Sequence, residues 1–127
     1  MEIDALLQSL PSGDHARLAE LASSDLPSLI NHLKSEADRH WRIDPAVSLG
    51  YADTLITIGE HTQTPATVAL GLMAKGDAFR YLDQLEEAWE VLEQAGELYR
   101  SIDDQVGWAR TRIGRLGICT EINQVTP

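Results

Sequence analysis

The chain has 127 residues, about the size of one domain, and its aromatic content of 6% means that the core must be built mainly from Leu, Ile, Val and Ala. Twenty acidic and ten basic residues give a net charge of −10, and a surface this acidic disfavours binding to nucleic acid or to an anionic membrane. The lone Cys119 excludes an intramolecular disulfide, and the lack of a signal peptide or a membrane-spanning apolar run predicts a cytoplasmic protein.

Apolar residues recur at helical spacing along almost the whole sequence, whereas the strict alternation of a half-buried strand is nearly absent. The sequence therefore predicts a single all-α domain, in which short connections favour antiparallel neighbours. About seven helices are expected, at residues 3–10, 14–22, 26–42, 45–59, 65–81, 85–101 and 105–121.

Capping residues and prolines mark the expected helix boundaries. Asp44-Pro45 and Thr64-Pro65 both place a side-chain oxygen just before a proline at the first helical position. Asp25 and Asp103-Asp104 are expected to cap the helices that follow them. Gly59 is the expected stop of the helix that begins at Pro45.

Self-comparison reveals a repeat. The pattern L-x-x-A-x-x-L at Leu49–Leu55 returns at Leu92–Leu98, 43 residues later, and Gly76 and Gly114 are 38 residues apart. Offsets near ~40 are typical of arrays of helical hairpins. A glycine inside a helix costs about 1 kcal/mol relative to alanine, so Gly76 indicates a point where another helix approaches closely.

Between Leu72 and Leu98 the sequence reads L-M-A-K-G-D-A-F-R-Y-L-D-Q-L-E-E-A-W-E-V-L-E-Q-A-G-E-L and resembles the tetratricopeptide repeat family. The residues at the packing positions of that family are Gly76, Phe79, Ala88, Leu92 and Ala95. The resemblance implies antiparallel hairpins stacked as a short solenoid. The first hairpin would lie at residues 26–59, the second at 65–101 and a terminal helix at 105–122, and the N-terminal helices expected at residues 1–24 lie outside the resemblance.

The chain also departs from the family pattern. Lys75 stands where leucine is usual, Asp83 stands where the turn glycine is usual, and residues 100–104 lack the proline that follows the second helix. That ending is similar to a longer bacterial variant of the repeat. Segments 33–39, 44–46 and 109–115 are similar to the N-terminal arrays that precede caspase-like CHAT protease domains in signalling proteins.

The resemblance also implies a binding groove, because the first helix of each hairpin lines the concave face in this family. The groove would receive an extended peptide or a helix of a partner protein. Carried onto this sequence, the partner-binding positions are Met73, Asp77, Arg80, Tyr81, Trp108, Thr111, Arg112 and Arg115. Arginine and aromatic side chains are common interface anchors, although Trp108 could equally belong to the core. An alternative role for the arginines of residues 105–120 is pairing with the glutamates of the neighbouring helix.

Residues that would support catalysis or metal binding do not converge in the sequence. The histidines, His15, His32, His40 and His61, lack the spacing of three or four that a helical metal pair needs. Cys119 is expected in the core beside Leu116 and Ile122. The glutamates of residues 86–97 are expected on a solvated helix face. We therefore expect no enzymatic activity and no cofactor.

The expected last helix carries an apolar stripe with no following helix to cover it. The stripe consists of Val106, Ile113, Leu116, Ile118 and Ile122. Four interpretations stay open: the helix caps the array, forms a dimer, contacts a partner, or belongs to a longer array of which this chain is a fragment. The first functional hypothesis is a protein-interaction module, part of a larger signalling assembly. The second is a structural subunit that self-associates through the last helix.

Overall fold

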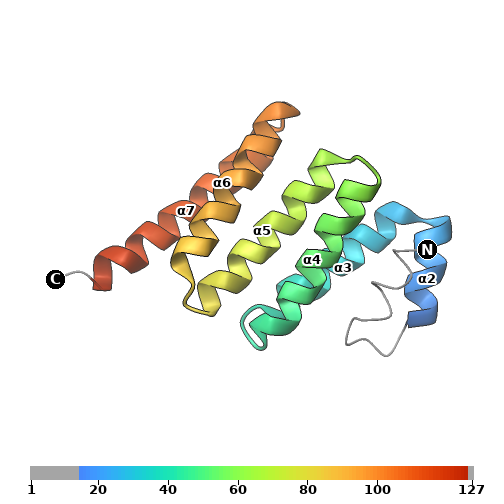
Figure 1. Cartoon of the computed structure of the whole chain (residues 1–127), viewed down its shortest axis with the longest axis horizontal. Helices are drawn as coiled ribbons and strands as arrows, with labels where there is room; N and C mark the ends of the chain where they lie inside the picture. Colours follow the sequence, from blue (N-terminus) through green and yellow to red (C-terminus); the bar gives the residue numbers. More distant parts are fainter. Residues whose placement is uncertain (1–14, 126–127) are drawn as a thin grey trace.

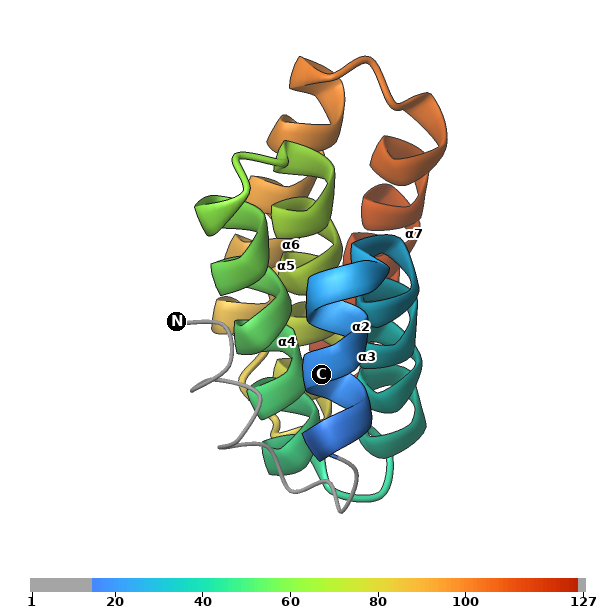
Figure 2. The ribbon, with the colours of Figure 1, turned by 90° about the vertical axis from the view of Figure 1, so that its right-hand side faces the viewer.

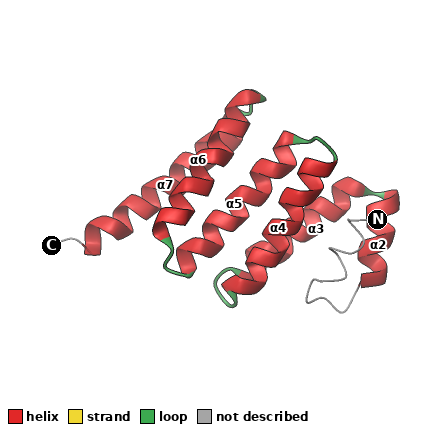
Figure 3. Ribbon diagram, in the orientation of Figure 1, coloured by secondary structure: helices red, strands yellow, loops and turns green. Residues whose placement is uncertain are grey.

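The computed structural model describes residues 15–125, and within that range it contains helices and short linkers only (Figures 1 and 3). Six helices follow one another: α2 (His15–Ser24), α3 (Leu26–His40), α4 (Pro45–His61), α5 (Pro65–Tyr81), α6 (Leu85–Ser101) and α7 (Gln105–Val125). The predicted all-α class is confirmed. The helix expected at residues 3–10 lies outside the described residues, so the expected total of seven stays a prediction.

The starts of α3, α4 and α7 follow the expected aspartate caps, and the start of α5 does not follow its expected threonine cap. The carboxylates of Asp25, Asp44 and Asp104 each accept a hydrogen bond from the backbone N–H three residues later, at 3.0 to 3.5 Å. Thr64 makes no such bond, and its hydroxyl lies 3.0 Å from the hydroxyl of Thr62 instead. Proline in the first turn is therefore the part of the Thr64-Pro65 signal that the structure confirms.

Three linkers of identical design follow α4, α5 and α6. In each one the middle residue takes the left-handed conformation, with φ of 54° at Gln63, 60° at Asp83 and 58° at Asp103. The next residue donates its N–H back to the last turn of the helix, as Gln84 does to the carbonyl of Phe79 at 2.9 Å. This is the Schellman ending, built here without its usual glycine.

Because the three linkers have the same design, the helices begin at a constant interval along the chain. Helices α4 and α6 begin at Pro45 and Leu85, and α5 and α7 begin at Pro65 and Gln105, so both pairs repeat after 40 residues. The offsets of 43 and 38 from the sequence patterns are therefore wrong by three and two residues. Residues three apart share a helix face, which is why the L-x-x-A-x-x-L pattern matched at the wrong register.

Each helix packs against its neighbours in the sequence, and α5 is the central one because it also contacts α3 and α7. The helices α4 and α6, in contrast, do not contact each other. Figure 2 shows the result, with α3 and α7 on one side of the molecule and α4 and α6 on the other. The side formed by α3, α5 and α7 is therefore the one on which non-consecutive helices meet.

Small residues let α5 have so many neighbours. Its buried positions include Ala69, Gly71, Ala74, Gly76 and Ala78. A Cβ atom added to Gly71 would lie 2.9 Å from the backbone oxygen of Ala52 in α4, so these two helices are in backbone contact. A Cβ added to Gly76 would lie 2.9 Å from Leu92 in α6, which confirms the close approach predicted at this glycine.

Gly59 does not end its helix as expected, because α4 continues to His61. A Cβ on Gly59 would lie 2.6 Å from the backbone nitrogen of Val68, so this glycine is required for close packing of α4 on α5. The helix ends through the left-handed residue Gln63 instead. The expected first hairpin, residues 26–59, accordingly extends by two residues.

Candidate functional site

The eight predicted partner-binding residues fall into three environments. Two belong to the core. Met73 packs against buried residues of α6 and α7, and Thr111 is 1% exposed and donates its hydroxyl to the carbonyl of Trp108 at 2.6 Å. Asp77, Arg80 and Tyr81 lie where α5 meets α3. The last three, Trp108, Arg112 and Arg115, lie where α7 meets α6. Thr111, although buried, lines the same groove as these three residues, so the structure brings four of the eight together there.

The first group belongs to a strip that α3 and α5 form together, which we call the α3–α5 strip. The ring of Trp41, at the end of α3, meets the ring of Tyr81 edge-on, with 4.5 Å between the centroids. Asp38 and Lys34 lie one and two turns before Trp41, and the ammonium of Lys34 is 2.7 Å from the carboxylate of Asp38. The strip consists of Lys34, Asp38, Trp41, Asp77, Arg80 and Tyr81.

Asp77 is the most perturbed charged group of the strip. Burial raises the pKa of Asp77 from 3.8 to about 6; the ammonium of Lys34 opposes the rise, the carboxylate of Asp38 adds to it, and the guanidinium of Arg80 opposes it. A carboxylate desolvated among two cations and another acid is held close to its titration point near neutral pH. Such a group favours a cationic or hydrogen-bond-donating ligand, which would restore the lost solvation.

Arg80 connects this strip to α7. Its guanidinium lies against Gly117, where an added Cβ would be 3.1 Å from one terminal nitrogen. Because α7 has no side chain at this position, the guanidinium can lie flat across the junction of α5 and α7. The strip thus reaches all three helices on the side where non-consecutive helices meet.

The sequence missed the α3 half of this strip. Lys34, Asp38 and Trp41 are spaced by four and three residues, so they share a face of α3. In the structure Trp41 is half-buried against Tyr81. The signal in the sequence that could have indicated this half of the strip is the mixture of charged and aromatic residues on one face of the helix.

The second group lines a groove between α6 and α7, which we call the α6–α7 groove. The guanidinium of Arg115 lies over the ring of Trp89 in α6, 4.0 Å from its centroid, and that of Arg112 lies 5.4 Å from the centroid of Trp108. Glu93 and Glu97 line the same groove, yet no ion pair joins them to these arginines among the described residues. The arginines therefore stack on tryptophan rings rather than pair with the glutamates.

One atom of this groove lacks a hydrogen bond. The Nε of Arg115 is the one buried side-chain nitrogen or oxygen without a hydrogen-bond partner in the part of the chain that the structure describes. Burial of an unbonded donor on a charged group is costly. The stacking on Trp89 offsets part of that cost, because a cation over an aromatic face contributes about 0.5–2 kcal/mol.

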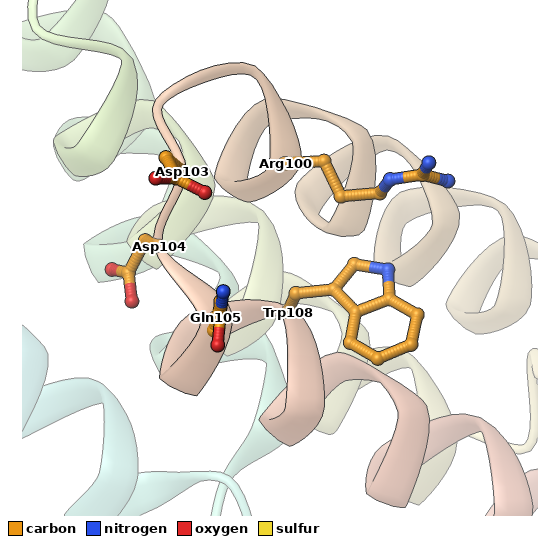
Figure 4. Close-up of a pocket in the computed structure, with 5 residues that line it drawn as sticks. All are labelled: Arg100, Asp103, Asp104, Gln105 and Trp108. Carbon is orange, nitrogen blue, oxygen red and sulfur yellow. The ribbon is translucent and has the colours of Figure 1, made fainter.

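A shallow pocket of about 390 Å³ lies at the start of α7, beside the groove (Figure 4). Arg100 and the indole of Trp108 lie next to each other on one side, and Asp103, Asp104 and Gln105 lie along the linker. Asp104 is occupied as the cap of α7 through Gly107. Arg100 and the 37% exposed Trp108 are therefore the groups that this pocket offers to a ligand.

Cys119 does not belong to the core as expected. It is half-buried and lines a cavity of about 280 Å³ with Trp89, Arg112, Arg115 and Leu116. Leu116, its expected neighbour in the core, is 66% exposed. Ile118, expected on the uncovered stripe, is instead fully buried against α6.

The glutamates of α6 are solvent-exposed as predicted, at Glu86, Glu87, Glu90, Glu93 and Glu97. Among the described residues no helix is long and apolar enough to cross a membrane, and no cluster of His, Cys, Asp and Glu has the arrangement of a metal site. Comparison with protein-family models, with curated proteins and with solved structures gave no match.

Proposed function

We propose that this chain is a protein–protein interaction module built as a short tetratricopeptide-like solenoid. The hairpins would be α3–α4 and α5–α6, and α7 would be the first helix of a third. The contact of α3 with α5 and of α5 with α7, set against the separation of α4 from α6, supports this arrangement. In this arrangement the side formed by α3, α5 and α7 would be the inner, concave face of the solenoid.

The α3–α5 strip is the proposed peptide-binding site. Its charges are of both signs, and Asp77 is desolvated beside the half-exposed ring of Tyr81. The desolvation of Asp77 is the observation that carries the proposal, because a carboxylate kept from water gains most from a ligand that donates hydrogen bonds or a positive charge. We infer a partner segment in which a basic residue, arginine or lysine, lies near an apolar residue. The basic residue would bind Asp77, and the apolar residue would pack on Trp41 and Tyr81.

A library of random peptides displayed on phage, selected against the immobilised chain, tests this proposal. Selected peptides should carry a basic residue. Their affinity, measured by fluorescence anisotropy, should fall at least about tenfold in Tyr81→Ala and in Asp77→Asn. Glu90→Gln, an exposed change on α6, is the matched control and should have no effect. Peptides that bind Tyr81→Ala and Asp77→Asn as tightly as the parent chain would refute the site.

The location of such a module in a larger signalling assembly rests on the resemblance of segments 33–39, 44–46 and 109–115 alone.

Self-association is the second candidate function, and the exposed apolar residues Val106, Ile113 and Leu116 of α7 favour it. Light scattering over a range of protein concentrations separates the two. A mass that rises with concentration supports self-association, and a constant monomeric mass refutes it.

A further inference from the structure

Helix α7 carries an exposed apolar line with the spacing of a coiled-coil seam. Val106, Ala109, Ile113 and Leu116 follow one another at intervals of three, four and three residues, which are the a and d positions of a heptad. All four are exposed, with 64% of Val106, 69% of Ile113 and 66% of Leu116 accessible to solvent. We call this line the α7 seam.

Burial elsewhere on α7 shows that the seam is a separate face. Thr111 and Ile118, on the opposite side of the helix, are buried against α6. The seam is also distinct from the α3–α5 strip, with which it shares no residue. Single apolar residues scattered over a surface are normal, but here three large aliphatic side chains lie in line on one exposed helix face. Such a contiguous apolar patch is typical of an interaction site.

The charges that α7 itself places beside the seam are all positive, and Glu93 and Glu97 of α6 line the groove next to Arg112. Arg110 and Arg112 occupy the e and g positions that flank Ile113, both are exposed, and no acidic residue occurs between Gln105 and Cys119. Arg110 makes no ion pair in the described part of the chain, and Arg112 lies over Trp108. On a chain of net charge −10, this is a local reversal of sign.

Charges at e and g positions select the partner of a helix seam, because they face the corresponding charges of the other helix. A second copy of α7 would bring arginines opposite arginines, and would also bring together two chains with a net charge of −10 each. A helix with glutamate or aspartate at these positions would neutralise Arg110 and Arg112.

We propose that the α7 seam is a second docking surface, whose partner is an amphipathic helix with an apolar a/d line flanked by acidic residues. The apolar side chains of that helix pack over Val106, Ile113 and Leu116, and its carboxylates meet Arg110 and Arg112. This surface operates independently of the α3–α5 strip.

Two synthetic 21-residue helical peptides test the proposal. Both carry leucine at a and d; one has glutamate and the other lysine at every e and g position. Fluorescence anisotropy with the full chain should show that the glutamate peptide binds at least about tenfold more tightly than the lysine peptide, and that added salt weakens its binding. Equal affinities for the two peptides would overturn the proposal.

Substitutions then locate the site. Ile113→Ser and Arg112→Glu should each weaken binding of the glutamate peptide about tenfold or more, and Arg112→Glu should strengthen binding of the lysine peptide. Both positions are exposed, so folding is retained, which circular dichroism verifies. Arg42→Glu is the matched control, because Arg42 is an exposed arginine in the linker between α3 and α4, 4.7 Å from the ring centroid of Trp41, and it should change neither affinity.

Two results would contradict the proposal directly. The first is unchanged binding of the glutamate peptide in Ile113→Ser. The second is a concentration-dependent dimer in light scattering that Ile113→Ser abolishes, which would assign the seam to a second copy of the chain. Loss of glutamate-peptide binding in Tyr81→Ala would place that peptide on the α3–α5 strip and also overturn the proposal, whereas failure of the α3–α5 strip itself leaves the seam unaffected.

Discussion

The α4–α5 and α6–α7 interfaces join helices through linkers of the same design, yet they differ in how they are filled. Glycines bring α4 and α5 into backbone contact at Gly59 and Gly71. Between α6 and α7 the glycines instead make room for side chains, since Gly107 faces the ring of Tyr99 and Gly114 faces Leu92. The first interface has no room for a side chain at these two positions, and the second leaves arginine and tryptophan side chains at its edge. The two interfaces therefore differ in the side-chain chemistry that they leave at their edges.

Replacement of glycine by alanine should have the largest effect, with opposite sign at the two interfaces. Gly71→Ala places a Cβ against the backbone of α4, which cannot move without shifting the helix, so we expect a loss of about 2 kcal/mol or more in the free energy of unfolding. Gly114→Ala meets only the end of Leu92, at 3.2 Å, and should be neutral or stabilise by up to ~1 kcal/mol. Urea denaturation measures both. Similar values for the two variants would remove the proposed difference between the interfaces.

The pH dependence of stability should come from the α5 side of the molecule. Asp77 has a pKa of about 6 in the folded chain and an ordinary value of 3.8, so between these pH values the folded chain holds a proton that the unfolded chain releases. Stability attributable to this group should therefore fall as pH rises from about 4 to about 6. Asp77→Asn should stabilise the chain by about 1–2 kcal/mol at pH 7 and leave it unchanged below pH 4. Thermal denaturation across this range tests it, with Glu90→Gln as control. A parent chain that gains stability over the same interval would contradict the expectation.

Caps distinguish the starts of α5 and α7. The carboxylate of Asp104 accepts the N–H of Gly107 at 3.0 Å, and Asp104→Ala should cost about 1 kcal/mol. Thr64→Ala at the start of α5 removes no capping bond and should cost less than about 0.5 kcal/mol. Chemical denaturation of both variants provides the comparison. An equal loss at Thr64 would mean that its hydroxyl contributes through Thr62.

The smallest effect is expected in the linkers. Asp83 holds φ at 60°, a conformation that glycine adopts without steric cost, so Asp83→Gly should stabilise the chain by about 0.5 kcal/mol. The equivalent change at Asp103 should give a similar value, because the two linkers have the same conformation. A shift in the melting temperature checks both. Destabilisation by either glycine would mean that the aspartate side chain stabilises its linker.

The sequence predicted the helices well because aspartate caps, prolines and apolar spacing are local signals. It mistook Gly59 for a helix stop, since glycine serves both to end a helix and to admit a neighbouring one, and only packing distinguishes the two roles. It missed the left-handed linkers for the converse reason, because Gln63, Asp83 and Asp103 stand where glycine would have marked them.

The candidate sites were harder to predict than the helices. A helical period shows which residues share a face but not which neighbour that face meets. Met73 was therefore assigned to a binding groove, although in the structure it packs against buried residues of α6 and α7. The seam residues Val106 and Ile113 were recognised as uncovered, whereas Ile118, five residues further along, turns into the core.

The mainly sequential packing of the helices has a consequence for how this chain reaches its structure. Because each helix finds its main neighbours within about one helix length along the chain, few distant segments must meet during folding, and the domain should fold rapidly, as proteins dominated by local contacts do. Helix α5 touches four others and so forms the natural nucleus, whereas α7 gains contacts mainly from α6 and should be among the last to dock.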